Sequence, residues 1–179
     1  MRAAVTLLAE RLRGTRVLFL ALGDTAPPEQ IGPCASLRFV PHLKNLADVA
    51  GYFQAADVYL HAAAADTFPR AVLEALACGT PVVGTNVGGI PEQLRSLETD
   101  KPTGILVAPG DPESMALAIE KLLTDEPLRQ TLAANAVADA RERFDVVHQA
   151  HSQLQWYSEL IRDQNHILNE DSRHERSIC

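Results

Sequence analysis

Cysteines and long apolar runs are scarce in this chain of 179 residues. The three cysteines, Cys34, Cys78 and Cys179, are far apart and odd in number, and their spacing matches neither a zinc site nor a disulfide framework. No apolar run approaches the roughly 20 residues that a membrane-spanning helix needs. The sequence therefore predicts a protein of the reducing cytosol that has no transmembrane segment.

Positive charge is also in short supply, because 16 Lys and Arg stand against 23 Asp and Glu and leave a net charge of −7. No basic stripe runs along any segment, so nucleic acid is not an expected partner. The amino-terminal segment 1–14 is interrupted by Arg2, Glu10, Arg11 and Arg13. It lacks the apolar core of a signal peptide and is expected to form a helix.

Several motifs with a known chemistry are missing. The chain has no G-x-G-x-x-G fingerprint and no P-loop, which weakens a dehydrogenase or an NTPase hypothesis. It has no Asp-x-Asp, the usual sequence cue for a metal-bridged pyrophosphate, and no Gly-x-Ser-x-Gly. His148 and His151 fall on an expected helix and fit no metal-binding pattern. We therefore expect neither a metal ion nor a cofactor.

Five short apolar segments alternate with segments of helical periodicity, which is typical of a doubly wound α/β fold with a Rossmann-like parallel sheet. The expected strands are 16–22, 37–40, 57–60, 81–83 and 104–107. The expected helices are 2–13, one around 46–53, 69–78, 91–96, 113–123, 126–143 and 146–162. The run 16–22 is almost entirely apolar, so we expect that strand to be buried on both faces.

The length and the hydrophobic fraction of 46% fit one globular domain, which we place at residues 1–162. The remaining residues, 163–179, have little apolar content and are expected to form a disordered polar tail. No internal repeat or low-complexity block divides the chain further.

The stretch 57–92, DVYLHAAAADTFPRAVLEALACGTPVVGTNVGGIPE, holds the candidate site. Asp66 and Glu74 lie eight positions apart across its first loop-to-helix junction. Thr67 could cap that helix, and Pro69 suits its first turn. Helix N-termini offer free N–H groups and partial positive charge, while carboxylates accept hydrogen bonds from sugar hydroxyls. The pattern favours an anionic, hydroxyl-rich ligand such as a nucleotide or a sugar.

The charged residues of this stretch also have a purely structural interpretation. Arg70 and Glu74 stand at i and i+4, where they could form a surface ion pair. Asp66 could be a turn residue or an additional helix cap. Both interpretations remain open on these residues alone.

The same choice applies to the glycines and histidines nearby. Gly88 and Gly89 permit a close approach of backbone and ligand, although one glycine pair is weak evidence. His61 and His42 each follow an expected strand and either reach a ligand or are satisfied within the fold. Cys78, at the end of the helix, is expected to be a small buried filler and not a nucleophile.

Taken whole, the stretch resembles the carboxyl-terminal domain of retaining GT-B glycosyltransferases, the group that includes sucrose synthases, mannosyltransferases and glycogen synthases. The shared pattern is an acid, seven residues and a Glu, here Asp66 and Glu74, then Ala-x-Ala-x-Gly-x-Pro-Val-Val and a Gly-Gly-x-x-Glu turn, here 75–83 and 88–92. Further similar segments are the strand and glycine 17–23, the strand end 37–41 and the strand and loop 103–111. The resemblance covers residues from about 1 to 160.

The resemblance implies a site for a nucleotide-diphosphate sugar and transfer of its glycosyl group with retention. Glu74 would bind the ribose hydroxyls, and Asp66 would contact the transferred sugar, so these two form the expected catalytic pair. Backbone N–H groups of the helix start would face sugar and phosphate, and the end of the strand 37–40 would lie near the base. The residues expected to bind the donor are Val40, Pro41, His42, His61, Phe68, Arg70, Ala71, Gly88 and Gly89.

The sequence departs from the family pattern in three respects. Asp66 stands where the family usually has Glu, and Pro69 stands where it often has Gly, which removes one backbone donor. The Arg and Lys that clamp the pyrophosphate and the amino-terminal acceptor domain are not recognised in the sequence. Arg2, Arg11 and Arg13 do not match the clamp positions by pattern.

We therefore expect the donor half of a metal-independent glycosyltransferase, either a fragment or one subunit, that is inactive without its amino-terminal half. The expected location is the cytoplasm, with a peripheral position at the inner face of the membrane only through that missing half. The alternative is a non-catalytic nucleotide-binding or scaffold domain, which the missing clamp and Pro69 favour.

Overall fold

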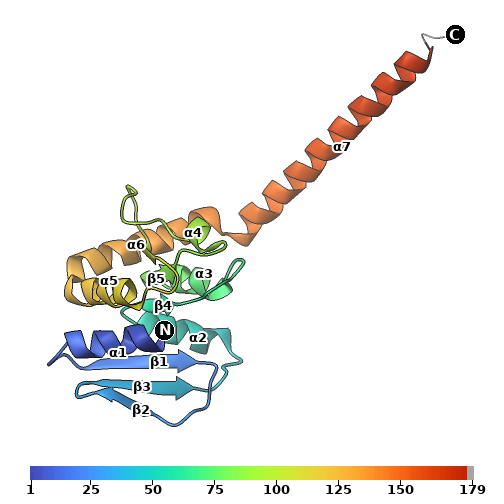
Figure 1. The fold of residues 1–179 in the computed structure, drawn as a ribbon. Helices are drawn as coiled ribbons and strands as arrows, with labels where there is room; N and C mark the ends of the chain where they lie inside the picture. The colour runs from blue at the N-terminus through green and yellow to red at the C-terminus, as the bar shows by residue number, and fades with distance from the viewer. Residues whose placement is uncertain (177–179) are drawn as a thin grey trace. The chain divides into compact units, whose positions relative to one another are not determined.

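The computed structural model describes the backbone of residues 1–176 and the side chains of residues 1–162. The chain forms two compact units, with the boundary between Ala140 and Arg141 (Figure 1). The helix expected at 146–162 lies in the second unit, and the domain bounds 1–162 stay a prediction.

The described residues contain six strands and seven helices. The strands are β1 (Val17–Leu22), β2 (Glu29–Gly32), β3 (Ala35–Val40), β4 (Tyr59–His61), β5 (Val82–Thr85) and β6 (Gly104–Val107). The helices are α1 (Arg2–Arg11), α2 (Leu46–Ala55), α3 (Arg70–Ala77), α4 (Ile90–Gln93), α5 (Pro112–Thr124), α6 (Glu126–Arg143) and α7 (Val146–Arg176). The predicted α/β class with parallel strands is confirmed, and each predicted helix and strand is present. The strand 104–107 and the helix 126–143 have the predicted ends, and the others are shifted.

The strands form two three-stranded sheets, in the orders β1-β3-β2 and β4-β5-β6. The pairs β1–β3, β4–β5 and β5–β6 are parallel, and β2 pairs with β3 antiparallel. Strand β2 is not predicted from the sequence, because its four residues, EQIG, hold a single apolar side chain and no alternation that signals a strand. The parallel pairs that the sequence predicts are divided by the hydrogen bonds between these two sheets.

The central strand β5 is buried on both faces and joins the two hydrophobic clusters of the first unit. Val83 belongs to a cluster built mainly from α1 and α5, with Leu8 and Ile119 among its members. Val82 belongs to the other cluster, which includes Val72 of α3 and Ile90 of α4. Helices thus cover both sides of the β4-β5-β6 sheet, and the carboxyl ends of its strands are fixed by a well-packed core.

Strand β1 contradicts the prediction that it is buried on both faces. Leu18, Leu20 and Leu22 are 51%, 40% and 42% exposed, whereas Val17 and Phe19 pack against the cluster of α1 and α5. Successive side chains of a strand point to opposite faces, so an apolar run is buried throughout only when both faces are covered. Among the described residues, only one face of β1 is covered.

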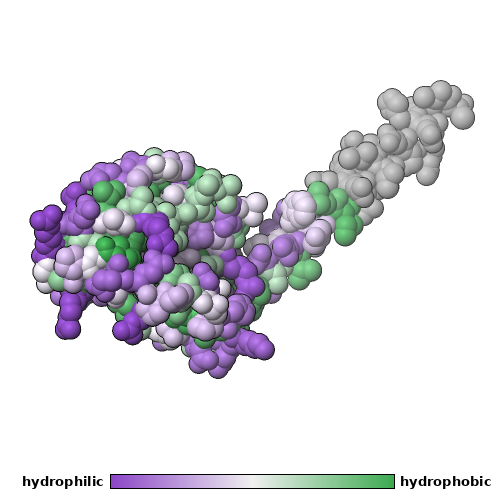
Figure 2. Space-filling view, turned by 60° about the horizontal axis from the view of Figure 1, so that its bottom comes forward, coloured by the Kyte–Doolittle hydropathy of each residue, from purple (hydrophilic) through white to green (hydrophobic). Residues whose placement is uncertain are grey.

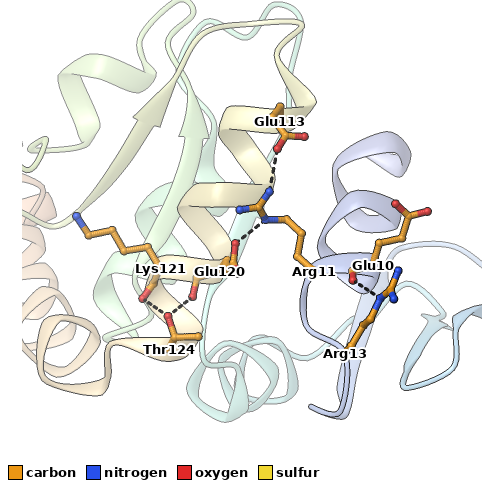
Figure 3. A network of polar contacts seen from close by, with 7 residues as sticks. All are labelled: Glu10, Arg11, Arg13, Glu113, Glu120, Lys121 and Thr124. Atoms are coloured by element: carbon orange, nitrogen blue, oxygen red, sulfur yellow. Dashed lines mark hydrogen bonds and ion pairs between the residues drawn. The ribbon is translucent and has the colours of Figure 1, made fainter.

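Helices α1 and α5 lie side by side and are joined by ion pairs (Figures 1 and 3). Arg11 points between two acids of α5, with its Nε 2.6 Å from Glu120 Oε2 and its Nη1 3.0 Å from Glu113 Oε1. Arg2 pairs with Glu29 of β2. Both arginines of the first helix thus serve contacts within the fold.

The second unit contains α7, which is longer than the predicted helix 146–162. The segment 163–176, predicted to be a disordered tail, is helical, and 177–179 lie outside the described residues. No Gly or Pro interrupts α7, and Gln, Glu, Leu and Arg are good helix formers, so polar composition alone does not prevent a helix. Among the described side chains of α7, the exposed large apolar ones are Val146, Val147, Leu154, Trp156, Tyr157, Leu160 and Ile161. Figure 2 shows apolar patches along the described part of this helix.

Across the described residues, no helix has the length and apolar character that crossing a bilayer requires.

Replacement of Leu8 by Ala should lower the free energy of unfolding by about 2–5 kcal/mol, because Leu8 is fully buried on the side of α1 that packs against α5. The matched control is Leu20→Ala on the exposed face of β1, for which we expect a loss of at most about 1 kcal/mol. Urea unfolding followed by circular dichroism measures both values. An equal, large loss in the two variants would contradict the one-sided burial of β1.

Candidate functional site

The candidate site lies where β4 ends at His61 and the chain passes through a loop into α3. Helix α3 begins at Arg70, and Pro69 is its N-cap in an extended conformation. No side chain caps this helix, so the predicted cap by Thr67 is wrong. Instead, the buried amide of Gln93 in α4 donates from Nε2 to the carbonyl oxygen of Pro69 at 3.0 Å. A side chain from the next loop-helix junction therefore fixes the start of α3.

The Gly-Gly turn after β5 packs directly against the loop after β4. The N–H of Gly89 donates to the carbonyl oxygen of Thr67 at 2.8 Å. A Cβ at position 89 would lie 2.2 Å from that oxygen, and one at Gly88 would lie 1.7 Å from the carbonyl oxygen of Asp66. Any side chain at either position would therefore push the two loops apart. The structure thus gives the two glycines a packing role, and the approach of a ligand at them stays a prediction.

Tyr59, His61 and Asp66 form a polar cluster at the end of β4. The Tyr59 hydroxyl lies 3.0 Å from His61 Nδ1, and His61 Nε2 lies 3.5 Å from Asp66 Oδ2. The His61 side chain is 16% exposed and that of Asp66 is 33% exposed. Tyr59 and His61 are two residues apart on one strand, so their side chains point to the same face.

The negative charge of the second predicted acid, Glu74, affects the pKa of the same hydroxyl. Burial, and then the negative charges of Glu74 and Asp66, raise the pKa of Tyr59 to about 12. Burial and the charge of Glu74 also raise the pKa of the Cys78 thiol, which disfavours the reactive thiolate. Both carboxylates are therefore close enough to Tyr59 to shift its titration, and the fold brings together the two acids that the sequence singles out.

Glu74 also forms the ion pair that the structural interpretation of the sequence anticipated. Arg70 Nη2 lies 3.5 Å from Glu74 Oε1 in an i,i+4 arrangement, with the Arg70 side chain 84% exposed. Such an exposed pair contributes little to stability, typically about 0.3–0.5 kcal/mol. Its presence leaves the carboxylate of Glu74, which is 37% exposed, accessible to a ligand.

The carboxyl end of α3 is closed by a glycine and held by hydrogen bonds of Thr80. Gly79 adopts a left-handed conformation with φ of 75°, and the N–H of Thr80 donates to the carbonyl oxygen of Ala75. The Thr80 hydroxyl donates to the carbonyl oxygen of Phe53 at the end of α2. This end of the helix is thereby tied to α2 and into the core.

The residues predicted to lie near the nucleotide base are at the end of β3, which belongs to another sheet than β4. Val40 ends β3, and its carbonyl oxygen accepts a hydrogen bond from the N–H of Gly23, in the loop after β1. Pro41 and His42 follow in an exposed loop. No hydrogen bond or ion pair joins these three residues to the two acids in the part of the chain that the structure describes, so their predicted role remains a prediction.

Two residues of the site were not named by the sequence analysis. Tyr59 could have been found, because its i,i+2 relation to His61 on a strand places the two rings together. Gln93 gives no such signal, since a glutamine on a short helix is ordinarily exposed, whereas here it is fully buried. In the residues that the structure describes, no group of three or more His, Cys, Asp or Glu side chains is placed to hold a metal ion.

Residues 29–139, more than half of the chain, match the family of glycosyl transferases group 1. The chain belongs to this family. The matched region contains β4, α3, β5 and the Gly-Gly turn, so the whole candidate site lies within it.

Similar proteins include D-inositol 3-phosphate glycosyltransferases. The protein from Actinosynnema mirum is 36% identical over 155 residues, which cover 79% of this chain and 36% of that protein. The protein from Kineococcus radiotolerans is 30% identical over 180 residues, which cover 91% of this chain and 41% of that protein. The chain thus spans well under half the length of either relative.

Similar solved structures are also glycosyltransferases. Sucrose-phosphate synthase from Thermosynechococcus elongatus superposes with a TM-score of 0.68 at 24% identity, over 90% of this chain and 43% of that one. Anabaena Alr3699/HepE in complex with UDP gives a TM-score of 0.62 at 31% identity, over 69% of this chain and 32% of that one. The carboxyl-terminal domain of a group 1 glycosyl transferase, LpcC, from Francisella tularensis gives a TM-score of 0.54 at 24% identity, over 62% and 54%. The fold is therefore that of the carboxyl-terminal domain of GT-B glycosyltransferases.

Substitution of Gly89 by Ala should destabilise the protein by about 1–3 kcal/mol, because the added Cβ would meet the carbonyl oxygen of Thr67. Gly51→Ala is the matched control, since nothing lies within 4 Å of its added Cβ. Alanine in the interior of α2 should stabilise by about 0.5–1 kcal/mol. Chemical denaturation gives both values, and a harmless Gly89→Ala would contradict the loop contact.

In an alkaline titration, the Tyr59 phenol should ionise at a higher pH than an ordinary tyrosine, because its pKa is raised from 10.0 to about 12. Since the folded pKa is raised, the contribution of this group to stability is complete below about pH 10 and is lost as the pH rises through about 12. Phenolate absorbance against pH, compared between the wild type and Tyr59→Phe, measures this. A component near pH 10 that disappears in Tyr59→Phe would show that the ring is not buried as described.

Proposed function

We propose that this chain is the donor-binding domain of a glycosyltransferase, which binds a nucleoside-diphosphate sugar for transfer of its glycosyl group with retention. The observation that carries the proposal is that the two acids flank the start of α3, with Asp66 beside His61 at the end of β4 and Glu74 on the helix. Burial raises the pKa of Tyr59, and the charges of Glu74 and Asp66 raise it further. Membership of the group 1 family supports it, as does the likeness to a structure described as a complex with UDP.

Each part of the site has a role in this proposal. Glu74 accepts hydrogen bonds from the ribose hydroxyls, and Asp66 accepts them from the transferred sugar. The first hydrogen bond within α3 is donated by Val72, to Pro69. The N–H groups of Arg70 and Ala71 precede it, at the positive end of the helix, and suit the phosphates. Fixed dipoles of this kind stabilise the negative charge that develops on the leaving diphosphate.

Catalysis in this proposal needs a second domain that holds the acceptor, either on the same polypeptide or on another. The chain matches 36% and 41% of the two relatives described above, which leaves more than half of each to provide further parts. UDP is the first nucleotide to test, because UDP is the ligand named for a similar structure at 31% identity.

A non-catalytic nucleotide-binding or scaffold domain is the second candidate. The specific observation in its favour is that Arg2 and Arg11 are engaged by Glu29, Glu113 and Glu120, so neither serves as a phosphate clamp. In that case the chain binds a nucleotide without any contribution from the sugar.

Thermal unfolding in the presence of UDP, GDP, ADP and their sugar conjugates tests the donor site. A ligand at 100 times its Kd adds about 2.7 kcal/mol to the stability of the folded state. For a chain of this size we expect the midpoint to rise by about 5–10 °C with one nucleotide family. The rise should disappear in Glu74→Ala, because the ribose hydroxyls lose their acceptor.

Glu126→Ala is the matched control, since Glu126 is an exposed acid at the start of α6 that contacts Gln130. This variant carries the same change of charge and should keep the full rise. A folded wild type that shows no rise with any of these ligands at millimolar concentration would overturn the proposed donor site. A rise that persists in Glu74→Ala would remove the assigned role of this residue.

A further inference from the structure

His61 has a buried ring nitrogen that makes no hydrogen bond within the described residues, which makes it a candidate for contact with a ligand. Its Nδ1 is held by the Tyr59 hydroxyl at 3.0 Å. Its Nε2 is buried, and it makes no hydrogen bond within the described part of the chain. The nearest acid oxygen, Asp66 Oδ2, is 3.5 Å away, beyond the 2.7–3.2 Å of an ordinary N–H···O bond. Buried polar atoms in folded proteins nearly always have a partner, so this atom needs an explanation.

The contacts of His61 with Tyr59 and Asp66 together favour one position for the proton on the imidazole ring. The Tyr59 phenol stays protonated in the neutral range, because burial and two negative charges raise its pKa to about 12. A protonated hydroxyl can donate to Nδ1 or accept from it, so this contact is compatible with both tautomers, and Nε2 carries the N–H where the hydroxyl donates. The opposite tautomer would turn the lone pair of Nε2 toward the carboxylate of Asp66, which is electrostatically unfavourable. The N–H of Nε2 thus points at the space beside Asp66.

The pairing of one N–H donor with one carboxylate selects the chemistry of the ligand atom. A hydroxyl accepts from the N–H and at the same time donates to the carboxylate. A phosphate oxygen only accepts, and at this point it would face the negative charge of Asp66. The Asp66 side chain is 33% exposed, so a ligand can reach its carboxylate from solvent, and a hydroxyl meets the buried Nε2 when this side chain turns aside.

We propose that His61 and Asp66 together bind one hydroxyl of the transferred sugar, with His61 Nε2 as the donor, Asp66 as the acceptor and Tyr59 as the positioning residue for the tautomer. This inference rests on the proposed function and adds a sugar-recognising side chain to it. The pair discriminates a nucleotide sugar from the bare nucleotide, whereas Glu74 and the start of α3 bind the part that the two ligands share.

Isothermal titration of the complete chain with UDP and with UDP-glucose tests this inference. The wild type should bind UDP-glucose more tightly than UDP. His61→Phe keeps a ring of similar size but has no N–H, so it should weaken binding of UDP-glucose about tenfold and change the Kd of UDP less than twofold. Tyr59→Phe should weaken UDP-glucose by a smaller factor, because both tautomers of His61 then become populated.

Two further variants separate a specific role from a structural one. His61→Gln can present an amide N–H near the position of Nε2 and should restore part of the preference for UDP-glucose. His148→Phe, on α7, makes the same substitution outside the first unit and should keep the preference unchanged. Circular dichroism and the unfolding midpoint establish that each variant is folded.

The outcomes distinguish this inference from the proposed function. A wild type that binds none of UDP, GDP, ADP and their sugar conjugates overturns the proposed function and this inference with it. A wild type that binds UDP and UDP-glucose equally, or a folded His61→Phe that retains the full preference, overturns the inference and leaves the nucleotide site standing. Equal weakening of the two ligands in His61→Phe also overturns it, because a hydroxyl of the sugar is then not what His61 recognises.

Discussion

The candidate site depends on the contact between the loops that follow β4 and β5. The N–H of Gly89 donates to the carbonyl oxygen of Thr67, and the buried amide of Gln93 donates to that of Pro69. Neighbouring parallel strands end at the same edge of a sheet, but that alone leaves their loops free to diverge. These two hydrogen bonds hold the loops together, and the glycines at positions 88 and 89, where a Cβ would collide with backbone, allow the close approach.

Burial of the sheet behind this surface determines its electrostatics. Strand β5 is covered on both faces, so the end of β4 beside it carries Tyr59 and His61 at the margin of a low-dielectric core. Burial raises the pKa of the Tyr59 phenol, and the negative charges of Glu74 and Asp66, which act more strongly there than in water, raise it further. A protonated phenol next to an imidazole gives the site a neutral donor beside a carboxylate, which is an arrangement suited to hydroxyl groups.

Much of the fold was predictable because its signals are local. The apolar segments of β1, β3 and β5 and the Gly-Thr-Pro turn after α3 stand out from the sequence, and Gly79 takes the left-handed conformation that such a turn requires. The short strand β2 lacks such a signal, because its pairing with β3 is made by the backbone. The exposure of Leu20 was equally hidden, since an apolar run does not tell whether both faces of its sheet are covered.

The sequence by itself determined the spacing of Asp66 and Glu74, the family pattern around them and the helix start between them, because these follow from neighbouring residues. Only the tertiary structure decided that Gln93 holds the start of α3 and that the Gly-Gly turn packs on the loop after β4. It also decided that His61 stands between Tyr59 and an acid. Those contacts join residues from different elements, and their distances depend on how the helices and strands pack, which no local pattern encodes.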